Sequence, residues 1–87
     1  FEKPDTDTFR GLVLAFEAMR RGGNIPTVFN AANEKAVALF LDRKISYLQI
    51  TEIIEEAMGH CNFIAHPDVD EILETEQEAY RFIGDRW

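Results

Sequence analysis

Apolar side chains recur every three or four residues through most of this 87-residue chain, and this spacing restricts the fold more than any other feature of the sequence. Such a period places the side chains on one face of an α-helix, whereas a strand alternates with a period of two. No segment sustains a two-residue alternation, and no Asn-Gly or Asp-Gly pair marks a hairpin turn. The sequence therefore predicts an all-α chain whose four helices and short connections favour a four-helix bundle.

Glycine and proline mark the break between the first two helices. The first helix is expected to begin near Asp7 or Thr8 and to end at Gly22-Gly23, because glycine adopts the left-handed conformation after a helix without a Cβ clash. Its apolar face would consist of Phe9, Leu12, Val13, Phe16 and Met19. Pro26 or Thr27 opens the second helix, which we expect to end near Asp42-Arg43-Lys44 with cations in its last turn.

Two more helices are expected in the second half of the chain. The third would run from about Leu48 to Gly59, opened by a capping box between Ser46 and Gln49. Pro67 keeps residues 59–68 out of a helix. Two capping-box patterns follow, Asp68 with Glu71 and Thr75 with Glu78. We expect a short turn at 69–73 and then a helix over about 75–84.

The start of the chain resembles a domain boundary. Residues 1–7 are polar and contain Pro4, so we expect a linker from a preceding domain, followed by the bundle at 8–87. The chain has no initiator Met and no signal-peptide pattern. No apolar run approaches the roughly 18–20 residues of a membrane helix. Cys61 is the only cysteine, which excludes an intrachain disulfide and suits a reducing compartment. We therefore expect a cytoplasmic domain without membrane association.

Charge is divided unevenly along the chain. Residues 1–44 carry seven Lys and Arg against six Asp and Glu, whereas residues 45–87 carry two against ten. The formal net charge of -7 disfavours nucleic acid as a partner, because a negative surface repels phosphates. The acidic stretch from 45 to 80 is either a solvated face or a surface for a basic partner. The second alternative would make the chain an independent acidic protein-interaction module.

Several catalytic and ligand-binding patterns fail on spacing. The aspartates at 5 and 7, and those at 68 and 70, lack the further ligands of a calcium loop. The five glycines form no phosphate-binding loop. Ser46 is the only serine and lies in Ile-Ser-Tyr, which excludes an acyl-carrier attachment site and gives nucleophilic catalysis no support. Two sites stay open.

The first open site is a zinc site at His60, Cys61 and His66. Only these three potential ligands lie in the loop, and no fourth Cys or His occurs elsewhere. The alternative is a pair of surface histidines and a buried, apolar Cys61.

The second open site is the polar group Asn30, Asn33 and Glu34. Spacings of three and four place these residues on one stripe of an alanine-rich helix. They either lie on an exposed face or hydrogen-bond to another segment or domain, and asparagine is mildly unfavourable within a helix without such a reason.

The most specific pattern in the chain is Asn-Ala-Ala-Asn-Glu at 30–34, within a stretch from Ile25 to Leu41. With this pattern the chain resembles the C-terminal domain of the 1-deoxy-D-xylulose 5-phosphate reductoisomerase family. The weakest part is 58–68, and Gln77-Glu78 replaces an expected aromatic residue. Further matches occur at Phe1–Asp5, Thr8, Phe9, Ile45, Tyr47, Ile50, Val69, Ile72, Leu73, Glu74 and Ala79.

This resemblance implies a parent enzyme that converts 1-deoxy-D-xylulose 5-phosphate to 2-C-methyl-D-erythritol 4-phosphate in non-mevalonate isoprenoid biosynthesis. It implies NADPH and Mg²⁺ or Mn²⁺ as cofactors and a homodimer as the assembly. The family's catalytic, cofactor and metal motifs belong to the N-terminal and catalytic domains and do not occur in this sequence. We therefore expect a non-catalytic structural domain that packs on the catalytic domain, with Asn30, Asn33 and Glu34 in an interdomain or structural network.

Overall fold

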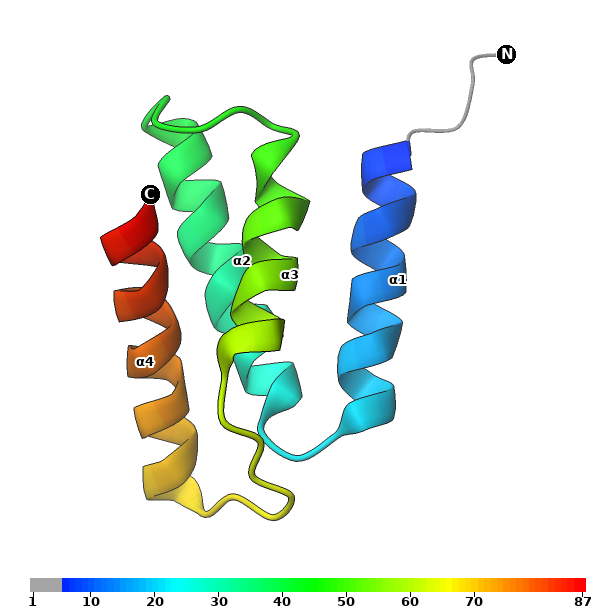
Figure 1. The fold of residues 1–87 in the computed structure, drawn as a ribbon, viewed down its shortest axis with the longest axis vertical. Coiled ribbons are helices and arrows are strands. Elements are labelled where there is room, and N and C mark those ends of the chain that lie inside the picture. The colour runs from blue at the N-terminus through cyan, green and yellow to red at the C-terminus, as the bar shows by residue number, and fades with distance from the viewer. Residues whose placement is uncertain (1–5) are drawn as a thin grey trace.

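A computed structural model describes the backbone of residues 6–87 and the side chains of residues 10–87. Four helices follow one another: α1 (Thr6–Arg21), α2 (Ile25–Leu41), α3 (Gln49–His60) and α4 (Val69–Arg86). They alternate in direction and lie roughly side by side (Figure 1). Residues 6–87 contain no strand, and the predicted all-α, four-helix architecture is confirmed.

The start of α1 can be compared with the expected boundary between linker and bundle. It begins at Thr6, two residues inside the segment assigned to the linker, and residues 1–5 lie outside the described part of the chain. The division into a linker at 1–7 and a bundle at 8–87 therefore stays a prediction.

Helix α2 is the centre of the bundle. It packs against α1, α3 and α4, whereas α1 and α4 do not contact each other within the described residues. Figure 1 shows α1 and α4 on opposite sides of the central pair. The core between the helices is formed by Leu14, Ala18, Ile25, Val28, Ala32, Ala36, Leu39, Ile45, Ile53, Ile54, Ala57, Met58 and Ile83. An open arrangement of this kind leaves one side of each outer helix without a helical neighbour.

The apolar face predicted for α1 is not its buried face. Leu14 and Ala18 enter the core, whereas Leu12, Phe16 and Met19 are 52%, 63% and 74% exposed. Side chains before Arg10, Phe9 among them, lie outside the described part. The buried face therefore combines the large Leu14 with the small Ala18, and Gly11 lies close to it: a Cβ on Gly11 would lie 3.6 Å from the Thr51 methyl group, an ordinary van der Waals distance.

Helix α4 corrects the expectation of a turn at 69–73. It is one continuous helix from Val69, and the first capping-box pattern starts it. The Asp68 carboxylate accepts a hydrogen bond from the Glu71 amide at 2.8 Å, and the Glu71 carboxylate accepts one from the Asp68 amide at 3.0 Å. This pair satisfies two free amides at the helix start. The second pattern is not used, because the Thr75 side chain is buried within the helix.

The end of α2 also differs from the expectation. No basic residue lies in its last turn, and Arg43 and Lys44 follow the helix instead. Arg43 adopts a left-handed conformation with φ 62°. The Arg43 amide donates to the Phe40 carbonyl and the Lys44 amide to the Leu39 carbonyl, both at 2.9 Å, as in a Schellman motif. An arginine therefore holds the position that glycine usually takes.

Helix α3 begins and ends within one residue of its predicted bounds. The Gln49 side chain accepts a hydrogen bond from the Ser46 amide at 2.8 Å, which is half of the expected capping box. The Ser46 side chain does not complete it, because Leu48 is the residue at the cap position and makes no side-chain cap bond. None of the helices within residues 6–87 combines the length and the hydrophobicity needed to cross a membrane.

Candidate functional site

The Asn-Ala-Ala-Asn-Glu segment of α2 is divided between the core and the surface. Ala31 and Ala32 are buried, and their small side chains allow the neighbouring helices to approach α2. Asn30, Asn33 and Glu34 are all exposed. The helical spacing predicted from the sequence therefore does place these three polar residues together, on a solvent-facing stripe.

One of the three polar residues is connected within the domain. The Tyr80 hydroxyl donates a hydrogen bond to the Glu34 carboxylate at 2.8 Å and links α4 to α2. This bond, together with burial and the negative charge of Glu34, raises the pKa of Tyr80 to about 12. Among the hydrogen bonds between described side chains, none involves the side-chain amides of Asn30 or Asn33. Both side chains are exposed, so their amides can bond to groups outside this domain.

A shallow hollow lies beside Asn30, between α1 and α2. Its volume is about 250 Å³. Its lining is apolar apart from the one amide and consists of Ala15, Ala18, Met19, Pro26, Phe29 and Asn30. The exposed apolar residues Leu12, Phe16 and Met19 of α1 border this hollow, because Met19 belongs to its lining.

A second polar centre, Asn24, lies inside the domain and was not identified from the sequence. Asn24 is only 1% exposed. Its side-chain nitrogen donates to the Asn62 carbonyl at 2.8 Å and to the Thr75 hydroxyl at 3.1 Å, and its oxygen accepts from the Ile64 amide at 2.9 Å. Its own backbone amide donates to the Ile64 carbonyl at 3.0 Å. Asn24 therefore fastens the α3–α4 loop and α4 to the α1–α2 turn.

The local sequence explains why the buried role of Asn24 is not predicted from the sequence alone. Asn24 follows two glycines and precedes Ile25-Pro26, a pattern typical of an exposed turn. It is the cap residue of α2, yet its side chain makes no cap hydrogen bond, because all of its polar atoms are used by the loop and α4. The hydrogen-bond partners of Asn24 lie 38 to 51 residues away in the sequence, so no local sequence pattern predicts them. Only an amide supplies both the donors and the acceptor needed here.

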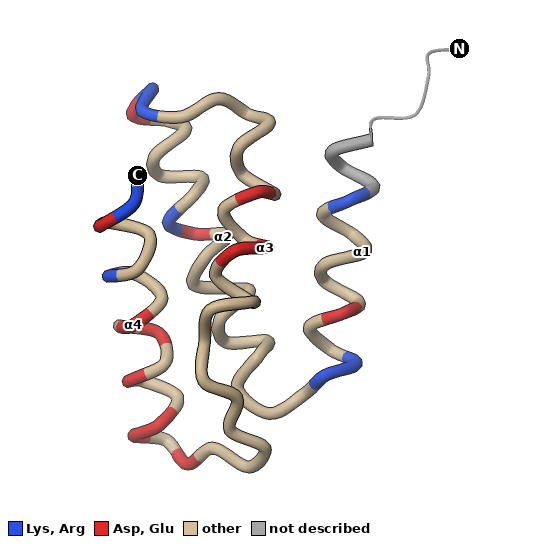
Figure 2. The backbone as a smooth tube through the Cα atoms, viewed as in Figure 1, with Lys and Arg blue, Asp and Glu red and all other residues tan. Residues whose placement is uncertain are grey.

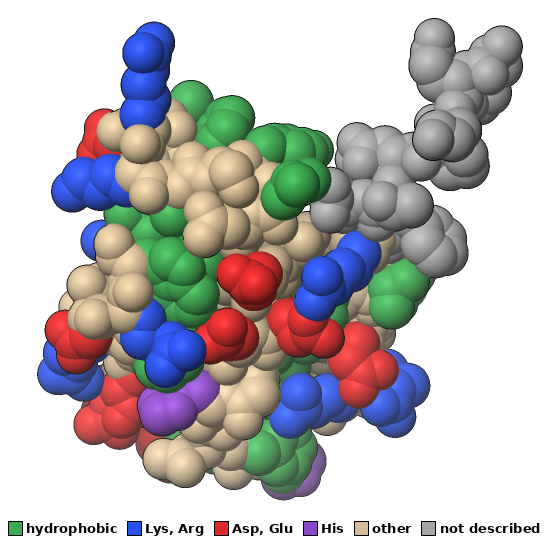
Figure 3. Space-filling view, turned by 45° about the horizontal axis from the view of Figure 1, so that its top comes forward, with side chains coloured by type: hydrophobic (Ala, Val, Ile, Leu, Met, Phe, Trp, Pro, Cys, Tyr) green, Lys and Arg blue, Asp and Glu red, His purple; other side chains and the backbone are tan. Residues whose placement is uncertain are grey.

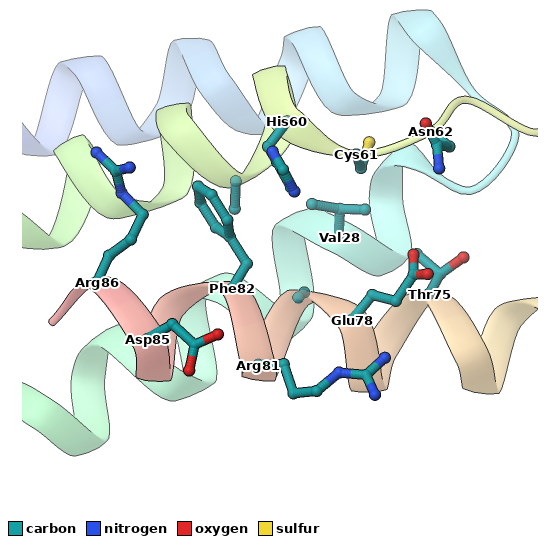
Figure 4. A pocket seen from close by; sticks show the side chains of 12 residues that line it. Val28, His60, Cys61, Asn62, Thr75, Glu78, Arg81, Phe82, Asp85 and Arg86 are labelled. Carbon is teal, nitrogen blue, oxygen red and sulfur yellow. The ribbon is translucent and has the colours of Figure 1, made fainter.

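A larger groove of about 450 Å³ lies between the end of α3 and the second half of α4, as Figure 4 shows. The His60 ring stacks on the Phe82 ring with centroids 4.1 Å apart, and the Arg86 guanidinium carbon lies 5.4 Å from the Phe82 ring centroid. Charged side chains of both signs line the groove: Glu78, Arg81, Asp85 and Arg86. This mixture of signs gives the groove no preference for anions or cations.

Comparison with known proteins places the chain in a family. A family model described as the DXP reductoisomerase C-terminal domain matches residues 1–82. The chain belongs to this family. Along its whole length it is 64% identical to the 1-deoxy-D-xylulose 5-phosphate reductoisomerase of Agathobacter rectalis and 59% identical to that of Lachnospira eligens. The chain spans 23% of the length of each of these two relatives. No solved structure matches it.

The alternative zinc site is not assembled in this DXP reductoisomerase C-terminal domain. Within the described residues, no three His, Cys, Asp or Glu side chains form a group that could hold a metal ion. His60 stacks on Phe82, and the Cys61 thiol donates to the Met58 carbonyl at 3.5 Å. Burial raises the pKa of the Cys61 thiol, which disfavours the thiolate that zinc binds. The structure therefore does not bring His60, Cys61 and His66 together.

The acidic residues of the second half of the sequence lie mainly on two helices. Figure 2 shows acidic residues, without basic ones, along α3 and the first half of α4. Some are neutralised from neighbouring helices, since Arg10 pairs with Glu55, and Arg86 pairs with Glu56 at 2.8 Å. Figure 3 accordingly shows carboxylates and basic groups next to each other on the face that it presents. On this face the charges are interspersed.

Proposed function

We propose that this chain is the C-terminal structural domain of a 1-deoxy-D-xylulose 5-phosphate reductoisomerase, and that it packs on and supports the catalytic part of the enzyme. The observation that carries this proposal is the extent of the match. The chain is 64% identical to a relative of that name over its whole length, yet it spans only 23% of that relative. A domain that spans so little of the enzyme would support the reaction through its contacts with the remainder of the polypeptide.

We take the reaction of the whole protein from the relatives' name and from the resemblance. The longer polypeptide would convert 1-deoxy-D-xylulose 5-phosphate to 2-C-methyl-D-erythritol 4-phosphate, as a homodimer in the cytoplasm. NADPH would supply the hydride, and Mg²⁺ or Mn²⁺ would assist the reaction. The described residues of this chain do not fit either group, because they offer no three-ligand set and the sequence has no glycine-rich phosphate loop. Both would be held by other domains.

Two experiments test the supporting role. Titration of NADPH into the isolated chain in a calorimeter is expected to give no binding heat, and a saturable signal would contradict the proposal. Removal of residues 1–87 from the full-length enzyme is expected to abolish turnover of 1-deoxy-D-xylulose 5-phosphate, followed by NADPH absorbance. Full turnover by the truncated enzyme would show that the domain is dispensable.

We further propose that Asn30, Asn33 and Glu34 form a polar network at the interface with the catalytic domain. Supporting this, the motif turns its alanines inward and its amides outward, and Glu34 is oriented by Tyr80. Asn33→Ala in the full-length enzyme should lower its stability by about 1 kcal/mol, the usual contribution of a hydrogen bond. Gln77→Ala, which removes an exposed amide from α4, is the matched control. Equal effects of the two substitutions would contradict the network.

A further inference from the structure

We propose that the α1 stripe, defined as Leu12, Phe16 and Met19, is the surface on which the preceding part of the same polypeptide docks. The partner places an apolar side chain in the hollow between α1 and α2 and polar groups against Asn30. This inference rests on the proposed function, because it takes the remainder of a reductoisomerase chain as the occupant. It adds which face of the domain is covered.

The size and continuity of the apolar surface come first. The three side chains of the stripe follow one another at spacings of four and three residues and are each more than half exposed. The hollow of about 250 Å³ adjoins them, since Met19 belongs to both. Large contiguous apolar surfaces on a folded domain mark interaction sites, whereas single exposed apolar residues do not.

Charge distinguishes this surface from the other exposed apolar groups. No residue of the stripe or of the hollow lining is charged. The charged neighbours of the stripe, Glu17 and Arg20, pair with each other at 2.6 Å. Val69 and Leu73 of α4 are also exposed, but they lie beside Asp68, Asp70 and Glu74 in a stretch without Lys or Arg. The cores of protein interfaces are depleted in charged residues, because a buried and unpaired charge loses its hydration. The α1 stripe is therefore suited to burial, and the start of α4 is not.

The position of the stripe and the length of the relatives identify the occupant. The family is that of a C-terminal domain, and most of each relative lies outside the matched region. The remainder of the polypeptide therefore precedes α1, which is the first helix and carries the stripe. A partner tethered through the same chain is present at high effective concentration, so it meets this surface before any second molecule does.

The two methionines of the chain provide a direct test in the unmodified full-length enzyme. Met19 is 74% exposed within this domain, and Met58 is 3% exposed. The enzyme is treated with dilute hydrogen peroxide, and oxidation at each methionine is followed by mass spectrometry of its peptide. If the stripe is covered, Met19 oxidises at a rate close to that of Met58 and about tenfold more slowly than in the urea-unfolded enzyme, since oxidation follows exposure of the sulfur. Oxidation of Met19 at the unfolded rate would overturn the inference.

Hydroxyl-radical footprinting of the same sample separates failure of the inference from failure of the proposed function. Protection of Leu48 or Leu73 with Met19 open would mean that the domain docks through another face, so that only the inference fails. Protection at none of these sites would overturn both. Protection of Met19 that disappears on dilution would identify a second copy as the occupant and would also overturn the inference.

A matched pair of variants supplies an independent check. Leu12 and Leu73 are 52% and 55% exposed in this domain, so Leu12→Gln and Leu73→Gln remove similar apolar surfaces. In the full-length enzyme, Leu12→Gln is expected to speed Met19 oxidation severalfold, and Leu73→Gln is expected to leave it unchanged. Equal rates in the two variants would overturn the inference.

Discussion

The side-chain amide of Asn24 lies 3.1 Å from the Thr75 hydroxyl, although 51 residues separate the two positions in the sequence. Both residues are buried, and the same amide group also holds the backbone at Asn62 and Ile64. One side chain in the α1–α2 turn therefore fixes the α3–α4 loop and α4. The helices α1 and α4, which do not contact each other, are linked through this point.

Loss of the buried Asn24 side-chain amide should destabilise the domain more than loss of an exposed side-chain amide. Asn24→Ala removes three hydrogen bonds and leaves buried partners unsatisfied, so we expect the free energy of unfolding to fall by about 2–3 kcal/mol. Urea unfolding followed by circular dichroism measures this change. Gln77→Ala, at an exposed position of α4, is the control and should change stability by less than about 0.5 kcal/mol. Equal losses would refute the importance of the buried network.

The bond between Asn24 and Thr75 can be measured by a double-mutant cycle. Thr75→Val keeps the branched shape but removes the hydroxyl, and we expect it to lower the free energy of unfolding by about 1 kcal/mol. Combined with Asn24→Ala, it should cost less than the sum of the two single changes, because both act on one bond. Strict additivity would show that the two side chains are not coupled.

The two glycines that end α1 should differ in their tolerance of alanine. Both have positive φ, 68° at Gly22 and 59° at Gly23, so either substitution should cost about 1 kcal/mol of stability. At Gly23 a Cβ would also collide with the Ile64 carbonyl oxygen, whereas no neighbour lies within 4 Å at Gly22. Gly23→Ala should therefore cost about 1–3 kcal/mol more than Gly22→Ala. Thermal unfolding of the two variants tests this order, and the reverse order would contradict the close contact.

Arg43 offers a stabilising substitution. It follows α2 with φ 62°, a conformation that costs an L-residue about 1–2 kcal/mol and costs glycine nothing. We expect Arg43→Gly to raise the free energy of unfolding by about 0.5–1 kcal/mol, after the greater flexibility of glycine in the unfolded chain is subtracted. Lys44→Gly is the matched control, since Lys44 has no positive φ, and should not stabilise. A destabilised Arg43→Gly protein would argue against the left-handed conformation.

The Tyr80–Glu34 hydrogen bond should make stability fall at high pH. The pKa of Tyr80 is raised from 10.0 to about 12, so the folded state holds this proton more tightly than the unfolded state. The resulting stabilisation is fully present below about pH 10 and disappears as the pH rises towards 12. Because the pair lies near the surface, we expect an effect below about 1 kcal/mol.

Denaturant unfolding at several pH values tests this dependence. Tyr80→Phe should remove the part of the decline above pH 10 that depends on this bond. Tyr47→Phe is the control, because Tyr47 instead packs edge-on against Phe40 with ring centroids 5.8 Å apart. The same decline in the Tyr80→Phe protein as in the unchanged chain would exclude this explanation.

Local physical chemistry determined the helices of this protein, and these were readable from the sequence. Gly22-Gly23 ends α1, Pro26 lies in the first turn of α2, and Pro67 keeps the loop before α4 out of a helix. Each acts through the backbone within a few residues. The predicted start of the last helix near Thr75 was wrong, because the local patterns of Asp68 and Thr75 are alike. Only the burial of Thr75 against Asn24 separates them.

Tertiary structure decided which surfaces are buried. The large apolar residues of α1 form the more prominent stripe in the sequence, yet Leu14 and Ala18 face the core. Periodicity identifies an apolar face of a helix but not the surface against which the helix packs. In this domain α1 packs against α2 and α3. The role of Asn24 was equally hidden, since its partners lie far along the chain. The sequence by itself determined where the chain is helical, through local dihedral and capping preferences, whereas packing between distant segments determined which polar group is buried and which apolar face stays open.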